Sequence, residues 1–142
     1  MIGLDCNILV QLAFEEHPAH EKTVVAVRAH TQRSTKLLCS SSVITEFLHV
    51  VTDPRRFNPA LTMPEALNWI DGLLANPKLQ LIEPTHGCLR QALDWMRELN
   101  LGRKRILDTY LAAVIHTSGV RRLLTSDPAD FAVFGVLEVI TP

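Results

Sequence analysis

The sequence predicts a single α/β domain, residues 1–142, with three layers (α/β/α) built around a central parallel sheet of about five strands. The first observation is that short runs of branched apolar residues alternate along the chain with segments that have helical spacing and helix-capping residues. The second is the composition. A chain of 142 residues, 47% hydrophobic and 20% charged, is typical of one compact domain with a sizeable core.

The first ten residues, Met1–Val10, are apolar almost throughout and predict a strand buried on both faces of the sheet. This run contains a carboxylate, Asp5, and an amide, Asn7. An isolated ionised carboxylate is costly in such surroundings unless it is paired, hydrogen-bonded or bound to a metal. Ligands of open parallel sheets bind beyond the carboxyl ends of the strands, where Asp5 is expected to lie. In the alternative interpretation, Gly3, Asp5 and Asn7 form the wet face of an edge strand.

Capping residues and apolar spacing predict the remaining elements in order. Further strands are expected at Leu37–Ser40, Leu79–Ile82, Arg122–Thr125 and Val136–Ile140. Helices are expected at Ala19–Thr31, Val43–Val51, Pro64–Ala75, from the cap Thr85 to Leu99, and at Ile106–Ser118, with a short turn or helix after Asp127-Pro128.

Several classes of protein are disfavoured. No apolar run approaches the roughly 20 residues that span a bilayer, and the N-terminus lacks the pattern of a signal peptide, so a cytoplasmic protein is expected. The three cysteines lack the spacing of a zinc site and indicate reduced core thiols. A net charge of −1 argues against wrapping nucleic acid by bulk electrostatics, although it permits a small local basic patch.

Three further acids lie where acids are unusual. Glu46 falls on or beside the apolar stripe of its helix, and Asp108 is followed by apolar residues three, four and seven positions later, which places it on the buried face of its helix. Asp127 directly follows a strand that ends at the same sheet edge as Asp5. Each has a structural alternative, since Asp108 could cap a first turn and Asp127, ahead of Pro128, is a natural N-cap.

Taken together, Asp5 and these acids bring four carboxylates from four segments toward one sheet edge. Like charges cannot remain ionised together without a cation, and Mg²⁺, or Mn²⁺, is the hard oxygen-binding ion that suits such a cluster. Acid-only sites of this kind promote phosphodiester hydrolysis. The sequence contains no glycine-rich phosphate loop, no G-x-S-x-G and no H-E-x-x-H motif. His17 and His20 are expected to be solvated surface, and His49 a neighbour of the site or a bystander.

Four stretches resemble the motifs of PIN domains, in the order and spacing of that family. They are Asp5-Cys6-Asn7-Ile8-Leu9, similar to D-T-N-[IV]-L; Thr45-Glu46-Phe47; Leu107-Asp108-Thr109-Tyr110-Leu111-Ala112-Ala113; and Thr125-Ser126-Asp127-Pro128-Ala129-Asp130-Phe131, similar to T-x-D-x-x-F. The chain length and the segment from Glu46 to Arg55 are most similar to VapC toxins of bacterial toxin–antitoxin pairs. This resemblance implies a magnesium-dependent ribonuclease that is inhibited by a VapB antitoxin and is usually a homodimer.

The resemblance also implies roles for individual residues. Asp5 and Asp108 would hold the principal metal, Glu46 would bind it directly or through water and orient the nucleophile, and Asp127 would complete the site. One departure is Cys6, where the family more often has Thr, because a thiol packs similarly but gives up a good hydroxyl.

Around the acids, Asn7 and Thr125 are expected to support the metal ligands through hydrogen bonds. Arg103 and Arg105 precede the helix that carries Asp108 and could clamp a phosphate, although a plain solvated loop is the alternative. Asp130 is expected to turn back toward its own backbone, so that Asp127 rather than Asp130 is the fourth acid.

The helix Pro64–Ala75 carries more apolar surface than one core-facing stripe needs, and part of it is expected to be covered by a second protomer or by the antitoxin. Its large apolar residues are Leu67, Trp69, Ile70, Leu73 and Leu74.

Three rival functions remain. The first is a catalytically silent PIN-like module that binds protein or RNA, which a complete acidic set disfavours. The second is a phosphotransfer domain with Asp5 as acceptor, which usually has another acid where Asn7 stands. The third is a DNA flap nuclease, for which the chain is short.

Overall fold

The computed structural model describes residues 1–32 and 35–142, and this part of the chain contains one five-stranded parallel sheet. Its strands are β1 (Ile2–Leu4), β2 (Leu37–Ser40), β3 (Leu79–Ile82), β4 (Arg122–Leu124) and β5 (Glu138–Ile140), in the order β3-β2-β1-β4-β5. Gly3 lies between Leu38 of β2 and Leu123 of β4, which sets the register at the centre of the sheet. The predicted α/β class with a parallel sheet of about five strands is confirmed.

The helices alternate with the strands, as the sequence pattern predicts. They are α1 (Cys6–Ala13), α2 (His20–Gln32), α3 (Ser41–Val51), α4 (Met63–Leu74), α5 (His86–Glu98), a 3₁₀ turn η1 (Arg103–Arg105), α6 (Ile106–Thr117) and α7 (Pro128–Ala132). Apart from the first ten residues, the predicted strands and helices begin and end within two residues of these bounds. Capping explains part of this agreement, because Thr62 and Glu65 form a reciprocal capping box at the start of α4.

The prediction that Met1–Val10 form one strand is wrong. The strand β1 ends at Leu4, and the helix α1 begins at Cys6. Asp5 occupies the N-cap position between them, with its side chain accepting a hydrogen bond from the backbone N–H of Cys6. The alternative of a wet edge strand is also wrong, because β1 lies between β2 and β4 and its residues are buried. A short apolar run does not distinguish a buried strand from a buried helix, and here it contains both.

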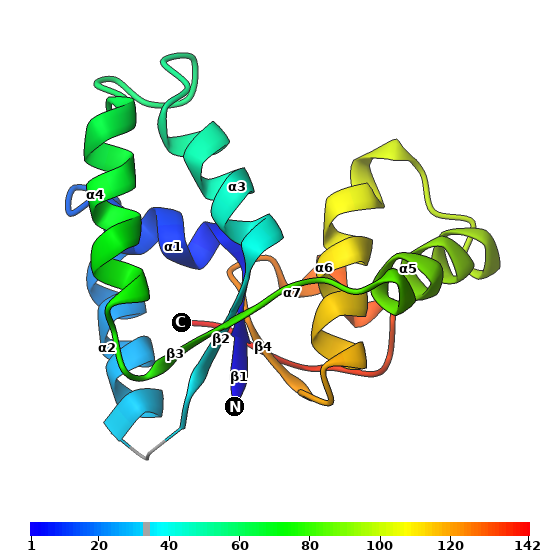
Figure 1. Ribbon diagram of the computed structural model, residues 1–142. Helices are drawn as coiled ribbons and strands as arrows, with labels where there is room; N and C mark the ends of the chain where they lie inside the picture. Colours follow the sequence, from blue (N-terminus) through cyan, green and yellow to red (C-terminus); the bar gives the residue numbers. More distant parts are fainter. Residues whose placement is uncertain (33–34) are drawn as a thin grey trace.

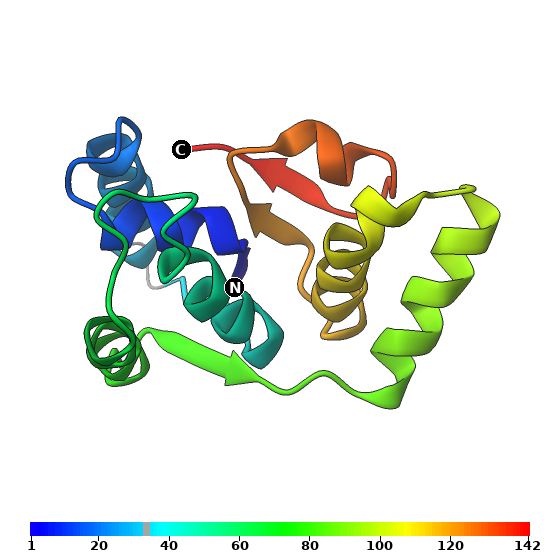
Figure 2. The same cartoon turned by 90° about the horizontal axis from the view of Figure 1, so that it is seen from above.

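Helices cover both faces of the sheet. Figure 1 shows α1, α2 and α4 on one side of the strands and α5 and α6 on the other, and Figure 2 shows the same separation from above. Helix α3 packs against α1 and α4, and α7 packs against α6. No helix in residues 1–32 and 35–142 has both the length and the apolar character needed to cross a membrane.

The core is closely packed where β1 meets α6. Ile115 of α6 is fully buried, and a β-carbon added to Gly3 would lie 2.4 Å from its Cδ1 and 3.0 Å from its Cγ1. Ordinary van der Waals contacts between carbons are about 3.5–4.0 Å, so the helix approaches the strand this closely only because residue 3 has no side chain. The close approach brings the first turn of α6 near the end of β1.

We expect Gly3→Ala to lower the free energy of unfolding by about 1–2 kcal/mol, because Ile115 has to leave its position in a packed core. The matched control is Gly72→Ala in α4, where an added β-carbon meets nothing within 4 Å. Gly72→Ala is expected to stabilise by about 0.5–1 kcal/mol through helix propensity. Urea unfolding followed by circular dichroism measures both, and equal midpoints for Gly3→Ala and the wild type would contradict the close-packing argument.

Helix α4 exposes large apolar side chains to solvent in addition to those it packs against the core. Ile70 is buried and the ring of Trp69 is stacked on Phe47 of α3 with ring centroids 4.7 Å apart, but Leu67 and Leu74 are 46% and 44% exposed. The expected surplus of apolar surface is therefore present on α4, although Trp69 contributes part of its surface to packing within the chain.

Candidate active site

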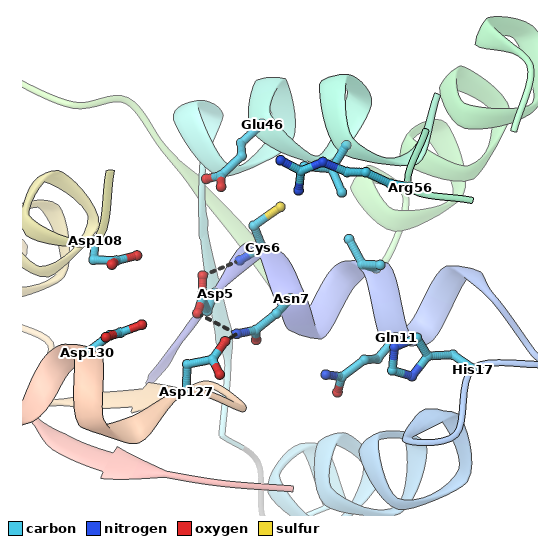
Figure 3. Close-up of a pocket in the computed structure, with 12 residues that line it drawn as sticks. Asp5, Cys6, Asn7, Gln11, His17, Glu46, Arg56, Asp108, Asp127 and Asp130 are labelled. Carbon is cyan, nitrogen blue, oxygen red and sulfur yellow. Dashed lines mark hydrogen bonds between the residues drawn. The ribbon is translucent and has the colours of Figure 1, made fainter. Parts of the chain in front are cut away.

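The candidate site lies at the carboxyl ends of the central strands. Strand β2 lies next to β1 on one side, and β4, which comes later in the chain, lies next to β1 on the other side. The direction in which strands are added to the sheet therefore reverses between β1 and β4. In open α/β sheets this reversal opens a crevice beyond the strand ends. A cavity of about 230 Å³ occupies it, and Figure 3 shows the side chains that line it. The acids among them are Asp5, Glu46, Asp108, Asp127 and Asp130.

Asp5 is fixed by three hydrogen bonds. Its Oδ1 accepts from the backbone N–H of Cys6 at 2.6 Å, and its Oδ2 accepts from Asn7 Nδ2 at 2.9 Å and from Thr125 Oγ1 at 2.6 Å. The side chain is only 8% exposed. Because Thr125 directly follows β4, the bond between Thr125 and Asp5 joins the ends of two adjacent strands. Asn7 and Thr125 thus both hydrogen-bond to Asp5, while their expected role in supporting a metal ligand stays a prediction.

Asp127 is connected to Asp5 through Asn7. The Asn7 amide nitrogen also donates to Asp127 Oδ2 at 3.0 Å, and the backbone N–H of Asp127 donates to Thr125 Oγ1 at 3.0 Å. Asp127 stands at the N-cap position of α7, but its side chain makes no capping hydrogen bond. The capping alternative for Asp127 is therefore wrong for its side chain, which is turned toward the cavity (Figure 3).

Glu46 and Asp108 approach the cavity from two helices. Figure 3 shows Glu46 projecting from α3 and Asp108 from the first turn of α6, both toward Asp5. Both are half-buried and line the cavity. Within the described chain neither carboxylate accepts a hydrogen bond, unlike that of Asp5. The capping alternative for Asp108 is thus wrong, and its oxygens, like those of Glu46, are available to a ligand.

Burial and mutual repulsion raise the pKa of three of these acids. Burial raises the pKa of Asp5 to about 6, against the lowering effect of the Thr125 and Cys6 hydrogen bonds, with repulsion from Asp108 and Asp127 adding to the rise. Burial, then the charges of Asp5 and Asp108, raise the pKa of Glu46. Burial, then Asp130, raise that of Asp108. The cavity therefore disfavours its own negative charges and favours any cation that enters.

Asp130 does not turn back to its own backbone, so that prediction is wrong. Its carboxylate accepts a hydrogen bond from Arg105, whose second guanidinium nitrogen donates to the Asp130 carbonyl. Asp130 lines the cavity beside Asp108, whereas Asp127 lies on the Asp5 side (Figure 3). An ion pair between Arg105 and an acid 25 residues later has no local sequence signal, which explains the error. Arg105 is thus occupied by Asp130, and Arg103 is exposed and does not line the cavity.

Several residues that line the cavity were not predicted from the sequence, and two of them carry ionisable side chains. Arg56, from the segment between α3 and α4, lines the cavity, and so does His17, which was expected to be solvated surface. The thiol of Cys6 projects toward α3 (Figure 3), and burial followed by the charges of Glu46 and Asp5 raises its pKa, so it stays a neutral thiol there. The sequence did contain one indication for Arg56: it follows soon after the helix that carries Glu46, so it could be expected near the same site.

The donor chemistry of the cavity fits a divalent cation. The five acids supply only oxygen ligands, which is the donor set of Mg²⁺ and Mn²⁺ rather than of zinc. In the described part of the chain, no three acidic, histidine or cysteine side chains already converge closely enough to hold a metal ion. Carboxylates that repel one another are expected to stand apart in this way until a cation draws them together.

Solved structures share this fold along nearly the whole chain. Similar structures include the VapBC2 complex of Rickettsia felis bound to a DNA fragment from its promoter (TM-score 0.69, 19% identity, covering 99% of this chain and 98% of that one). Another is VapC20 of Mycobacterium tuberculosis, described as a toxin that cleaves the sarcin-ricin loop (TM-score 0.73, 16% identity, 98% of each chain). A third is VapBC-1 of nontypeable Haemophilus influenzae (TM-score 0.69, 16% identity, 99% and 98%).

At these identities the likeness shows the fold alone. A comparison with curated protein sequences finds no match. The sequence profile of the family described as PIN domain, however, matches residues 2–136, which is nearly the whole chain and includes all five cavity acids. The chain therefore belongs to the PIN-domain family.

Proposed function

We propose that this protein is a Mg²⁺-dependent endoribonuclease and the toxin of a VapBC-type toxin–antitoxin pair. The observation that carries the proposal is the cavity lined by five carboxylates from four segments of the chain, which repel one another. Such a site is costly to a protein that only binds a partner, and hydrolysis of a phosphodiester bond uses the cation that it attracts. The similar structures described as VapC toxins or VapBC complexes support the assignment.

The surroundings of each acid indicate its role in the proposed reaction. Asp5, held by Asn7, Thr125 and the Cys6 amide, has one fixed orientation and is the primary metal ligand together with Asp108. When bound, the metal lowers the pKa of a water molecule and neutralises charge that develops on the phosphate.

Glu46 and Asp127 complete the set. Glu46 makes no hydrogen bond within the described chain and has a raised pKa, so it can orient a water nucleophile and accept its proton. Asp127 ligates directly or through water, with its position set by Asn7 and Thr125.

The proposed partners are a VapB-type antitoxin and a second copy of the chain. The exposed leucines of α4, Leu67 and Leu74, lie on a face that an antitoxin or a second protomer would cover. Several of the similar structures are described as toxin–antitoxin complexes. RNA is the proposed substrate, because acid-only metal sites promote phosphodiester hydrolysis and one of the similar structures is described as a toxin that cleaves the sarcin-ricin loop.

We expect the purified protein, freed of antitoxin, to cleave cellular RNA in the presence of Mg²⁺ or Mn²⁺. EDTA is expected to abolish cleavage because the carboxylates alone cannot stabilise negative charge on the phosphate. End-labelled RNA resolved on sequencing gels measures the activity. Adding back the antitoxin encoded beside the gene should suppress it. Binding of RNA without cleavage in any divalent metal would instead favour the catalytically silent module.

A further inference from the structure

The cavity carries one guanidinium among its acids. Figure 3 shows the guanidinium of Arg56 reaching in from the α3 side toward Glu46, while His17 lies apart from it, next to Gln11. Among the described residues that line the cavity, Arg56 is the only arginine or lysine. A nuclease cavity that carried acids alone would repel the rest of the strand whose phosphate it cleaves.

The guanidinium of Arg56 is largely unused within the protein. The adjacent Arg55 occupies Asp53, with its Nε at 3.0 Å from Oδ1 and its Nη2 at 3.0 Å from Oδ2. Arg56 lies farther away, with its Nε at 3.8 Å from Asp53 Oδ2, and makes no side-chain hydrogen bond to the described residues. Its side chain is 58% exposed. Arg55 thus fixes the loop and leaves the five N–H donors of Arg56 available.

We propose that Arg56 forms a binding subsite for a backbone phosphate of RNA, adjacent to the phosphate that is cleaved beside the acids. This inference rests on the proposed ribonuclease function and deepens it by giving the substrate a path along the cavity. Arginine binds phosphate in a planar, bidentate manner that a point charge does not reproduce. The positive charge near Glu46 also offsets the repulsion between the acids and the approaching strand.

Binding of a single-stranded RNA tests the subsite. The probe is a 5′-fluorescein-labelled 12-nucleotide RNA of mixed sequence, followed by fluorescence anisotropy with Mg²⁺, and every protein carries Asp108→Asn to prevent cleavage. Arg56→Gln is expected to weaken binding about tenfold and to reduce the slope of log affinity against log salt by about 0.7, the value for one phosphate contact on a single strand. The control Arg28→Gln removes the same charge from an exposed position on α2 and should change neither quantity.

A second measurement distinguishes a phosphate contact from a structural effect. Replacing one phosphodiester of the probe at a time with an uncharged methylphosphonate should weaken binding to the Asp108→Asn parent at the contacted position, and much less so binding to the variant that also carries Arg56→Gln. Arg56→Lys should recover only part of the affinity. If Arg56→Gln binds RNA as tightly as its parent, the subsite is wrong while the ribonuclease proposal stands. If the parent protein does not bind RNA at all, both are overturned.

Discussion

Replacing Asp108 with asparagine is expected to abolish RNA cleavage while leaving the fold intact. The substitution keeps the shape of the side chain but removes a carboxylate that makes no hydrogen bond within the described chain and lines the cavity. Because the proposed metal is held by charge, we expect the cleavage rate to fall at least about a thousandfold, equivalent to about 4 kcal/mol of transition-state stabilisation. Initial rates on an end-labelled RNA under saturating Mg²⁺ give the measurement.

The matched control for this loss of charge is Asp94→Asn in α5. Asp94 forms an exposed i,i+3 pair with Arg97, away from the cavity, so its replacement should leave cleavage unchanged. Thermal unfolding checks the fold. Since burial and Asp130 raise the pKa of Asp108, removal of its charge should keep or increase the melting temperature at neutral pH. Native-rate cleavage by Asp108→Asn would refute the assignment of Asp108 as a metal ligand.

The metal-free protein is expected to lose stability as the pH rises from about 4 to above 6. The pKa of Asp5 is 3.8 in the ordinary case and about 6 in the fold, so between these values the folded state binds more protons than the unfolded state. Stability therefore falls as pH rises through this window, on the order of 2–3 kcal/mol for Asp5. The raised pKa values of Glu46 and Asp108 act in the same direction.

Urea unfolding in EDTA at pH 4.5, 6.0 and 7.5 measures this loss, and addition of Mg²⁺ at pH 7.5 should reverse it by about 2.7 kcal/mol at a hundred times its dissociation constant. The variant Asp5→Asn removes the titrating group, so its free energy of unfolding should depend less on pH than that of the wild type. Asp53, whose pKa is lowered to about 2 by the Arg55 hydrogen bonds, loses its contribution only as pH falls below the window. Greater stability of the metal-free protein at pH 7.5 than at pH 4.5 would contradict the prediction.

The sequence was sufficient for most of the fold because its local signals agree with one another. Apolar runs, caps such as Thr62 and Thr85, and the left-handed Gly119 after α6 all mark the same boundaries that packing selects. The failure over Met1–Val10 has a physical cause. Residues Ile8 and Leu9 are as fully buried in α1 as Ile2 and Leu4 are in β1, so hydrophobicity alone could not reveal the change of element at Asp5.

For the site, the spacing of apolar residues predicted that Glu46 and Asp108 lie near the core-facing sides of their helices. The predicted strand ends placed Asp5 and Asp127 at one edge of the sheet. All four line one cavity, while their catalytic role remains a proposal. The sequence could not identify the contacts between distant segments. The pairing of Arg105 with Asp130 depends on how η1 packs beside α7, and the availability of Arg56 depends on Arg55 having already occupied Asp53.

The hydrogen bond from Thr125 to Asp5 joins residues 120 positions apart, and this has a consequence for the timing of synthesis. A nascent chain presents Asp5 early but lacks Thr125, Asp127 and Asp130 until almost all of β4 and α7 have been made. At translation rates of about 5–20 residues per second, that interval is on the order of ten seconds. Throughout it the acidic cluster is incomplete, so the proposed metal site cannot form on the nascent chain before β4 and α7 have been made.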